Sequence, residues 1–208
     1  MTAGQLYAVV TSITGVILLL VWLYVTTNNA RSNEILFKSV FLFVLPGAIL
    51  VALPLELFHF PLSMWVVVLI EELLKTAAAA TERERMDRFS LVALFGVWEL
   101  MLAKPLWGLN QAADLESWSN LQLAGLAAAG IVTVLMHAVT AEIYAFRFAG
   151  RLGLALLVSW VVHISFNEAI DLLDVSLVSC LALTLPLVLT FAALWPRGSA
   201  ATQSSSSS

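Results

Sequence analysis

The sequence has little charge and almost no cysteine. Lys, Arg, Asp and Glu make up 12% of its 208 residues, roughly half the share found in soluble domains, whereas 61% are hydrophobic. The single cysteine, Cys180, excludes a disulfide framework within the chain. The ten Lys and Arg residues form no patch of the kind that binds nucleic acid, so we expect no nucleic-acid partner. These shortages together indicate a polytopic membrane protein.

The hydrophobic residues are concentrated in long apolar runs. Most of these runs are long enough to cross a bilayer as one helix. We therefore expect an all-α polytopic membrane protein with about seven transmembrane helices in one bundle. The predicted spans cover about residues 5–25, 36–58, 61–80, 89–103, 121–146, 152–172 and 175–195.

The N-terminal residues, the serine-rich tail and the prolines of the sequence are consistent with one transmembrane domain. Residues 1–6 lack the positively charged segment of a cleaved signal peptide, so we expect the first span to be retained. Residues 1–196 are predicted to form a single transmembrane domain, and residues 197–208 a disordered serine-rich tail. Pro46-Gly47 and Pro54 predict a kinked helix in the second span, and Lys104-Pro105 is predicted to end the fourth.

Positive charges alternate between the predicted loops. Cytoplasmic loops of membrane proteins carry an excess of Lys and Arg, so the alternation predicts an orientation. The N-terminus is expected outside and the C-terminus in the cytosol, which makes the protein a multi-pass protein of the cell membrane. The loops on the other side carry only Lys104, whereas the cytosolic positions are Arg31, Lys38, Arg83, Arg85, Arg88, Arg147, Arg151 and Arg197.

The third predicted span contains three charged residues, Glu71, Glu72 and Lys75. A charged side chain near the middle of a bilayer is costly, and crossing the membrane does not require one. Lys75 lies four residues after Glu71 and three after Glu72, so it can pair with either of them on one helix face. Either pairing leaves the other glutamate without a partner. The doubled glutamate therefore indicates a functional site.

Polar residues of four predicted spans lie at a similar depth. At ~1.5 Å per helical residue, each lies on the order of 15–18 Å from the cytosolic end of its span. Scattered polar residues would not share one depth, so we predict a polar intramembrane active site at which the four helices meet. Its members are Glu71, Glu72, Glu99, His137, His163 and Asn167, which follows His163 by one helical turn.

This set of side chains suits two kinds of hydrolysis. In one, a glutamate takes a proton from water while His and Asn donate hydrogen bonds to the developing oxyanion. In the other, Glu71, His137 and His163 hold a catalytic zinc ion. The chain lacks a His-Glu-x-x-His motif, so such a zinc site would have to be assembled from separate helices. No cofactor is certain, and zinc remains an open alternative.

The motifs resemble those of the PrsW-type intramembrane peptidases, relatives of the type II CAAX prenyl proteases and of bacteriocin-immunity proteins. In order, they are Glu71-Glu72-x-x-Lys75, Phe95-x-x-x-Glu99, His137 and His163-x-x-x-Asn167. The prenyl protease branch carries Glu-Glu-x-x-x-Arg and Phe-x-x-x-His at the first two motifs, so this chain is more similar to the PrsW side. The resemblance covers about residues 60–172, the predicted catalytic core.

The resemblance implies roles for these residues. Glu71 would activate the water, while Glu72 and Lys75, with Glu99 as a further supporting residue, would help to set its charge and orientation. His163 and Asn167 would line the oxyanion hole, and His137 would orient water or bind a metal. The implied substrate is a membrane-anchored or membrane-associated protein, such as an anti-sigma factor or a lipidated protein.

Two other functions stay open. Glu and His side chains inside a membrane also form the proton and ion pathways of transporters, so a proton- or metal-coupled transporter is one alternative. A catalytically inactive scaffold with the same core is the other. A retinal-type photoreceptor needs a Schiff-base lysine, and the last predicted span contains no lysine.

Overall fold

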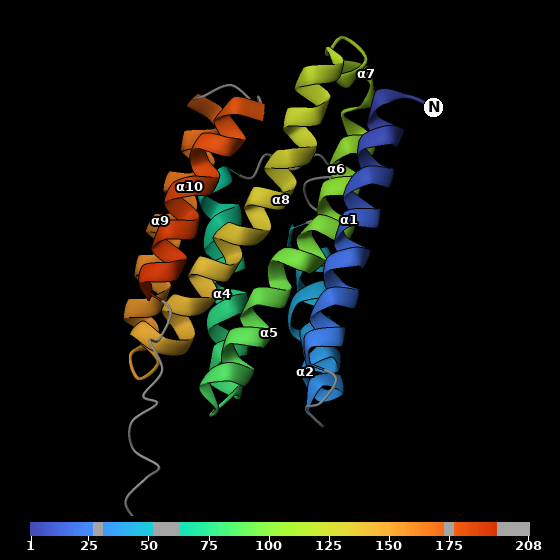
Figure 1. The fold of residues 1–208 in the computed structure, drawn as a ribbon. Helices are drawn as coiled ribbons and strands as arrows, with labels where there is room; N and C mark the ends of the chain where they lie inside the picture. Colours follow the sequence, from blue (N-terminus) through green and yellow to red (C-terminus); the bar gives the residue numbers. More distant parts are fainter. Residues whose placement is uncertain (27–30, 52–62, 173–176, 195–208) are drawn as a thin grey trace, which may run out of the picture.

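The computed structural model describes residues 1–26, 31–51, 63–172 and 177–194, which are helical apart from short turns, and no strand occurs among them. The fold is therefore that of an all-α protein (Figure 1). Its α-helices and π-helical segments (η) are α1 (Ala3–Thr26), α2 (Ser32–Ser39), η1 (Val40–Val44), α3 (Leu45–Gly47), α4 (Met64–Thr81), α5 (Arg85–Trp98), η3 (Glu99–Ala103), α6 (Lys104–Asn110), α7 (Ala112–Leu115), α8 (Asn120–Glu142), η4 (Ile143–Arg147), α9 (Leu152–Leu172) and α10 (Leu177–Leu194).

Five of the helical stretches are long and apolar enough to cross a membrane. A helix in lipid satisfies its own backbone hydrogen bonds, which is why such apolar sequences fold this way. The glutamate helix α4 is long enough, with 18 residues, but it is not among the five because it contains three charged residues, Glu71, Glu72 and Lys75. The apolar part of α10, Cys180–Ala192, is shorter still, so the number seven stays a prediction. The five stretches are Ala3–Val25, Ser32–Val51, Arg85–Asn110, Asn120–Arg147 and Leu152–Ile170.

The fourth predicted span is longer than expected. The prediction that it ends at Lys104-Pro105 is wrong, because α5, η3 and α6 follow one another without a break from Arg85 to Asn110. Proline lacks an N–H and is tolerated in the first turn of a helix. Here Pro105 occupies the start of α6, directly after the π-helical turn η3. Lys104 consequently lies within the bundle and not in a loop.

The second span also departs from regular α-helix near its proline. The helix changes to π-helical geometry in η1, and α3 with Pro46 follows. A proline removes the hydrogen bond that its N–H would have made to the preceding turn, and π-turns often accompany such an interruption. The structure shows this local change of helix type near Pro46, and the kink itself stays a prediction. Pro54 lies outside the described residues.

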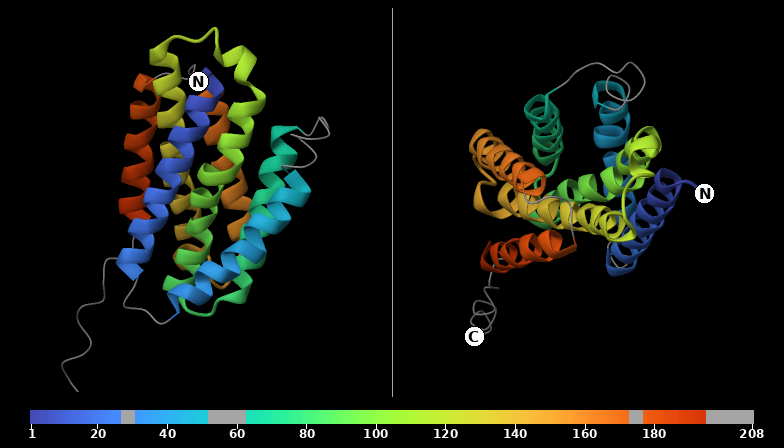
Figure 2. Two further views of the ribbon diagram at one scale, coloured as in Figure 1. Left: turned by 90° about the vertical axis from the view of Figure 1, so that its right-hand side faces the viewer. Right: turned by 90° about the horizontal axis from the view of Figure 1, so that it is seen from above.

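Helix α8 lies at the centre of the bundle and contacts α1, α5, α9 and α10 (Figure 2). Helix α4 packs against α5 and α9, and α1 packs along η3 and α6. Residues from α4, α5, α8 and α9 can therefore meet in the interior. These are the four helices to which the sequence assigns the site.

Charged residues join three turns at one end of the bundle, the lower end in Figure 1. The buried carboxylate of Glu82 accepts hydrogen bonds from Lys38 at 2.6 Å and from Arg31 at 3.2 Å. Arg31 also pairs with Asp87 at 2.5 Å, and Arg88 donates to the backbone oxygen of Ala149 at 2.8 Å. The basic turns that follow α1, α4 and η4 thus lie at the same end.

Candidate active site

Glu72 is the most fully bonded carboxylate of the interior. Its Oε1 lies 2.5 Å from Lys75 Nζ and accepts a hydrogen bond from His163 Nδ1 at 2.9 Å. The Tyr144 hydroxyl lies 3.2 Å from its Oε2. Glu72 and Lys75 are both completely buried, so the ion pair that the spacing allowed forms with Glu72 and not with Glu71. Because both of its oxygens have partners, Glu72 is not free to act on a ligand.

Glu71 has a different environment. Adjacent residues of an α-helix point about 100° apart, since one turn takes about 3.6 residues. The Glu71 side chain accordingly leaves the Glu72 network, is 14% exposed and lines a cavity. Its Oε2 lies 3.6 Å from His163 Nε2, which is beyond hydrogen-bond length. Within the described part of the chain, the Glu71 carboxylate has no hydrogen-bond partner.

His163 lies between the two glutamates. Its Nδ1 donates to Glu72 and its Nε2 faces Glu71, so one imidazole connects the bonded carboxylate with the free one. In the neutral tautomer that donates from Nδ1, the lone pair of Nε2 is directed to the Glu71 side. A carboxylate that fixes one ring nitrogen also fixes the orientation of the other.

Glu99 and His137 form a second carboxylate–imidazole pair. His137 Nε2 lies 2.6 Å from Glu99 Oε2, and the other oxygen of Glu99 lies 2.9 Å from Lys104 Nζ. His137 is completely buried, and Gly96 provides the space for its ring, because a Cβ at position 96 would lie 2.7 Å from His137 Cδ2. Glu99 thus binds one histidine and one lysine, as Glu72 does.

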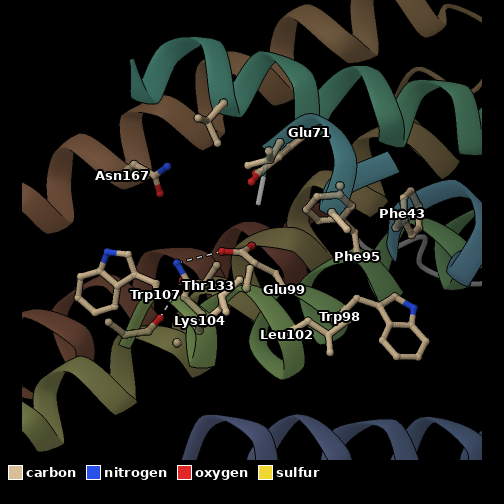
Figure 3. A pocket seen from close by; sticks show the side chains of 18 of the residues that line it. Phe43, Glu71, Phe95, Trp98, Glu99, Leu102, Lys104, Trp107, Thr133 and Asn167 are labelled. Atoms are coloured by element: carbon tan, nitrogen blue, oxygen red, sulfur yellow. Dashed lines mark hydrogen bonds and ion pairs between the residues drawn. The ribbon is translucent and has the colours of Figure 1, made fainter. Parts of the chain in front are cut away.

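A cavity of about 830 Å³ opens beside these pairs (Figure 3). Glu71 and Asn167 point into it from one side, and Glu99 with Lys104 lies on the other. Most of its lining is apolar, and the ion-paired Glu72, Lys75, His137 and His163 are not part of the lining. Its aromatic wall consists of Tyr7, Phe43, Phe95, Trp98, Trp107 and Trp118.

The structure thus brings the predicted site residues together, in two layers. Glu71, Glu99 and Asn167 line the cavity, and Glu72, Lys75, His137 and His163 lie behind them. No hydrogen bond to the Asn167 side chain is found among the described residues. The outer layer is where a ligand would make contact, and its member Glu99 is hydrogen-bonded to His137 of the inner layer.

The three residues considered as zinc ligands do not come together as a ligand set. Among the residues in the described ranges, no three His, Cys, Asp or Glu side chains are placed to hold one metal ion. His137 Nε2 is bonded to Glu99. His137 Nδ1 is buried and has no hydrogen-bond partner among the described residues. The residues present do not fit a site made of Glu71, His137 and His163.

Two residues of the network were not anticipated from the sequence. The sequence predicts that Lys104 lies in a loop, because Pro105 follows it, and it predicts no role for Tyr144. Tyr144 lies seven residues after His137, which is two helical turns on the same face, so this spacing was the available signal. Its hydroxyl lies 3.1 Å from the Glu72 backbone oxygen and 2.9 Å from Thr76 Oγ1.

Comparisons of the chain with protein-family models, with curated proteins and with solved structures find no match.

Proposed function

We propose that the protein is an intramembrane peptidase that hydrolyses a peptide bond of a membrane-anchored or membrane-associated protein through a water molecule activated by Glu71. The observation that carries the proposal is the contrast between adjacent glutamates. Glu72 is buried and bonded through both oxygens, whereas Glu71 faces the cavity without a hydrogen-bond partner among the described residues. A free carboxylate beside a largely apolar cavity is suited to take a proton from water.

The charges of the site support the same assignment. The three glutamates contribute −3 and the two lysines +2, so the cluster has one negative charge in excess when both histidines are neutral. Lys75 pairs with Glu72 and Lys104 with Glu99, which leaves the excess charge on Glu71. Glu71 is therefore the carboxylate of the cluster that no lysine neutralises, and it is the one left to take a proton from water.

The reaction follows from these positions. Glu71 takes a proton from water as the water oxygen bonds to the carbonyl carbon, and the electron pair of the C=O bond moves to oxygen. Asn167 donates a hydrogen bond to that oxygen from the neighbouring helix. As the C–N bond breaks, the C=O bond forms again and the leaving nitrogen takes the proton from Glu71. The carboxylic acid product then passes its proton to the amine, which gives a carboxylate and an ammonium ion.

The inner layer orients these groups. The sequence assigns His163 to the oxyanion hole, but the ring lies behind the cavity with Nε2 facing Glu71. We therefore assign His163, oriented by Glu72, to accepting a hydrogen bond at Nε2 from Glu71 once Glu71 has taken the proton from water. His137 has the corresponding position behind Glu99.

The finer architecture belongs to the same proposal. It consists of seven spans, an external N-terminus, a cytosolic C-terminus and membership of the PrsW-type group, with an anti-sigma-factor-like or lipidated protein as substrate. The order of the motifs and the basic turns at one end of the bundle support it.

A proton-coupled transporter is the second candidate. The observation in its favour is the row of polar groups through the interior, in which the rings of His137 and His163 contact each other between two glutamates. Such rows conduct protons in transporters. A transporter would move protons without hydrolysing any peptide.

The test uses the purified full-length protein in lipid nanodiscs and a library of quenched fluorescent peptides. We expect wild type and the exposed-loop control Glu84→Gln to cleave the same peptides, and Glu71→Gln to cleave none. Cleavage should persist after exhaustive chelation. Full activity of Glu71→Gln would refute the role of Glu71. Absence of any cleavage by wild type, combined with proton flux in liposomes, would establish the transporter instead, and absence of both would favour the scaffold.

A further inference from the structure

Lys104 is a cation in the cavity wall that the reaction above does not use. Its Nζ lies 2.9 Å from Glu99 Oε1, and 33% of its side chain is exposed, whereas Lys75 is completely buried. An ammonium group has three N–H donors, and the Glu99 oxygen can take one of them. The remaining donors and the exposed part of the side chain are available to a molecule in the cavity.

The position of Lys104 is opposite the water-activating side. Glu71 and Asn167 point into the cavity from α4 and α9, and Lys104 lies across from them with Glu99 (Figure 3). The close charged contact of Glu71 is with His163, and that of Lys104 is with Glu99. A peptide bond in the cavity would thus have a carboxylate on one side and an ammonium group on the other.

We propose that Lys104 forms an anion-binding subsite, which takes the tetrahedral oxyanion formed during hydrolysis and then the carboxylate of the product. This inference rests on the proposed function. When water attacks, its proton neutralises Glu71 and the negative charge appears on the substrate oxygen. The net charge of the cavity is unchanged, but the charge moves from the Glu71 wall to the substrate. Lys104 therefore attracts the transition state more strongly than the bound peptide, which is the condition for catalysis.

The competing explanation is that Lys104 only neutralises Glu99. Removal of Lys104 alone does not separate the two explanations. It removes the cation, but it also leaves the negative charge of Glu99 without its lysine, with His137 as its remaining partner. The double variant Lys104→Met/Glu99→Gln does separate them, because it removes the cation and the charge that it would neutralise. Its matched reference is Glu99→Gln, and Lys104→Arg keeps a cation at the same position.

The experiment measures binding of an apolar phosphinic tetrapeptide, which imitates the tetrahedral anion, and of its planar amide counterpart. Both are measured in the Glu71→Gln background, in which we expect neither to be hydrolysed. The Lys104→Met change should weaken phosphinic-peptide binding about 10²–10³-fold, the range for loss of one oxyanion-stabilising donor, and should leave amide binding nearly unchanged. The double variant should bind the phosphinic peptide as weakly as Lys104→Met does, and Lys104→Arg should retain much of the wild-type binding. Thermal unfolding of each variant verifies that it is folded.

Two results would overturn the inference. One is phosphinic-peptide binding by the folded double variant that equals that of Glu99→Gln. The other is an equal loss of phosphinic and amide binding. Turnover by wild type is measured separately, so the two proposals can fail independently. Lys104-dependent binding of the phosphinic peptide without any peptide cleavage would retain the anion subsite and refute the peptidase.

Discussion

The imidazole rings of His137 and His163 lie edge to face, with their centroids 5.0 Å apart and their planes at 87°. Each ring binds a different glutamate on its own side, His137 binding Glu99 and His163 binding Glu72. Two carboxylate–imidazole pairs from four helices thus meet at one contact. A change in either pair is expected to affect the other, because residues in contact do not act independently.

Substitution of the adjacent glutamates Glu71 and Glu72 should change stability to very different degrees. Glu72→Gln leaves the completely buried Lys75 without a charged partner, and breaking a buried pair in this way costs about 3–5 kcal/mol. Glu71→Gln breaks no hydrogen bond in the described part of the chain, so its unfolding temperature should stay near that of wild type. Thermal unfolding in one detergent, followed by tryptophan fluorescence, compares the two variants directly. Equal destabilisation by both would contradict the assignment of Lys75 to Glu72.

Tyr144→Phe should lower stability by about 1–3 kcal/mol, because it removes the hydroxyl that lies close to Glu72 and Thr76 in a fully buried position. Thr14→Val is the control, since the Thr14 hydroxyl is partly exposed and, among the described residues, bonds only to the backbone of its own helix. Chemical unfolding of the two variants measures the difference. If Tyr144→Phe is as stable as Thr14→Val, the hydroxyl does not hold Glu72.

Two glycine substitutions test the close packing of α5 against α8. A Cβ at Gly96 would lie 2.7 Å from Cδ2 and 2.8 Å from Cβ of His137, so Gly96→Ala must displace the ring or the helix. Overpacking of this kind typically costs about 1–3 kcal/mol. Gly47→Ala meets no atom within 4 Å, and alanine is the better helix former, so this control should be neutral or slightly stabilising. The unfolding temperatures of both variants are the measurement, and equal values would refute the predicted contact.

Glu82 should matter far more for stability than Glu34, although both pair with Lys38. Glu82 is 1% exposed and binds both Arg31 and Lys38, so Glu82→Ala removes two hydrogen bonds to charged groups and should cost about 1.5–3 kcal/mol, although Arg31 keeps its pair with Asp87. Glu34 is half exposed, and exposed ion pairs contribute little. Unfolding of Glu82→Ala and Glu34→Ala under the same conditions checks the contrast. A similar loss from Glu34→Ala would contradict the prediction that the ion pairs of Glu82 with Arg31 and Lys38 contribute most of the stability here.

Residues 84 and 117 should be labelled from opposite sides of the membrane. Both positions are exposed, and the α4–α5 turn and the segment after α7 lie at opposite ends of the bundle in Figure 1. In a Cys180→Ala background, Glu84→Cys should react with an impermeant thiol reagent only from the cytosolic side, and Ser117→Cys only from outside. Labelling of both from one side would contradict the proposed topology.

Much of the site could be predicted because the relevant signals are local. Glutamate and histidine are rare within apolar runs, since lipid penalises them, and their distance along each helix gives a depth. Depth along four helices was enough to bring Glu71, Glu72, Glu99, His137 and His163 into one region. The assignment of Lys104 was wrong for an equally local reason. Pro105 normally ends a helix, and the sequence has no evident signal for the π-helical turn that accommodates it.

The sequence by itself determined the helical membrane class and the membership of the polar cluster, because apolar length and the cost of charge in lipid act residue by residue. Only the tertiary structure decided which glutamate faces the cavity. Glu71 and Glu72 are neighbours of the same type, and their difference arises from the rotation of α4 about its axis against α5 and α9. That rotation places Glu72 against Lys75, His163 and Tyr144, and it leaves Glu71 at the cavity. Packing between helices sets the rotation, so the spacing of residues along one helix does not contain it.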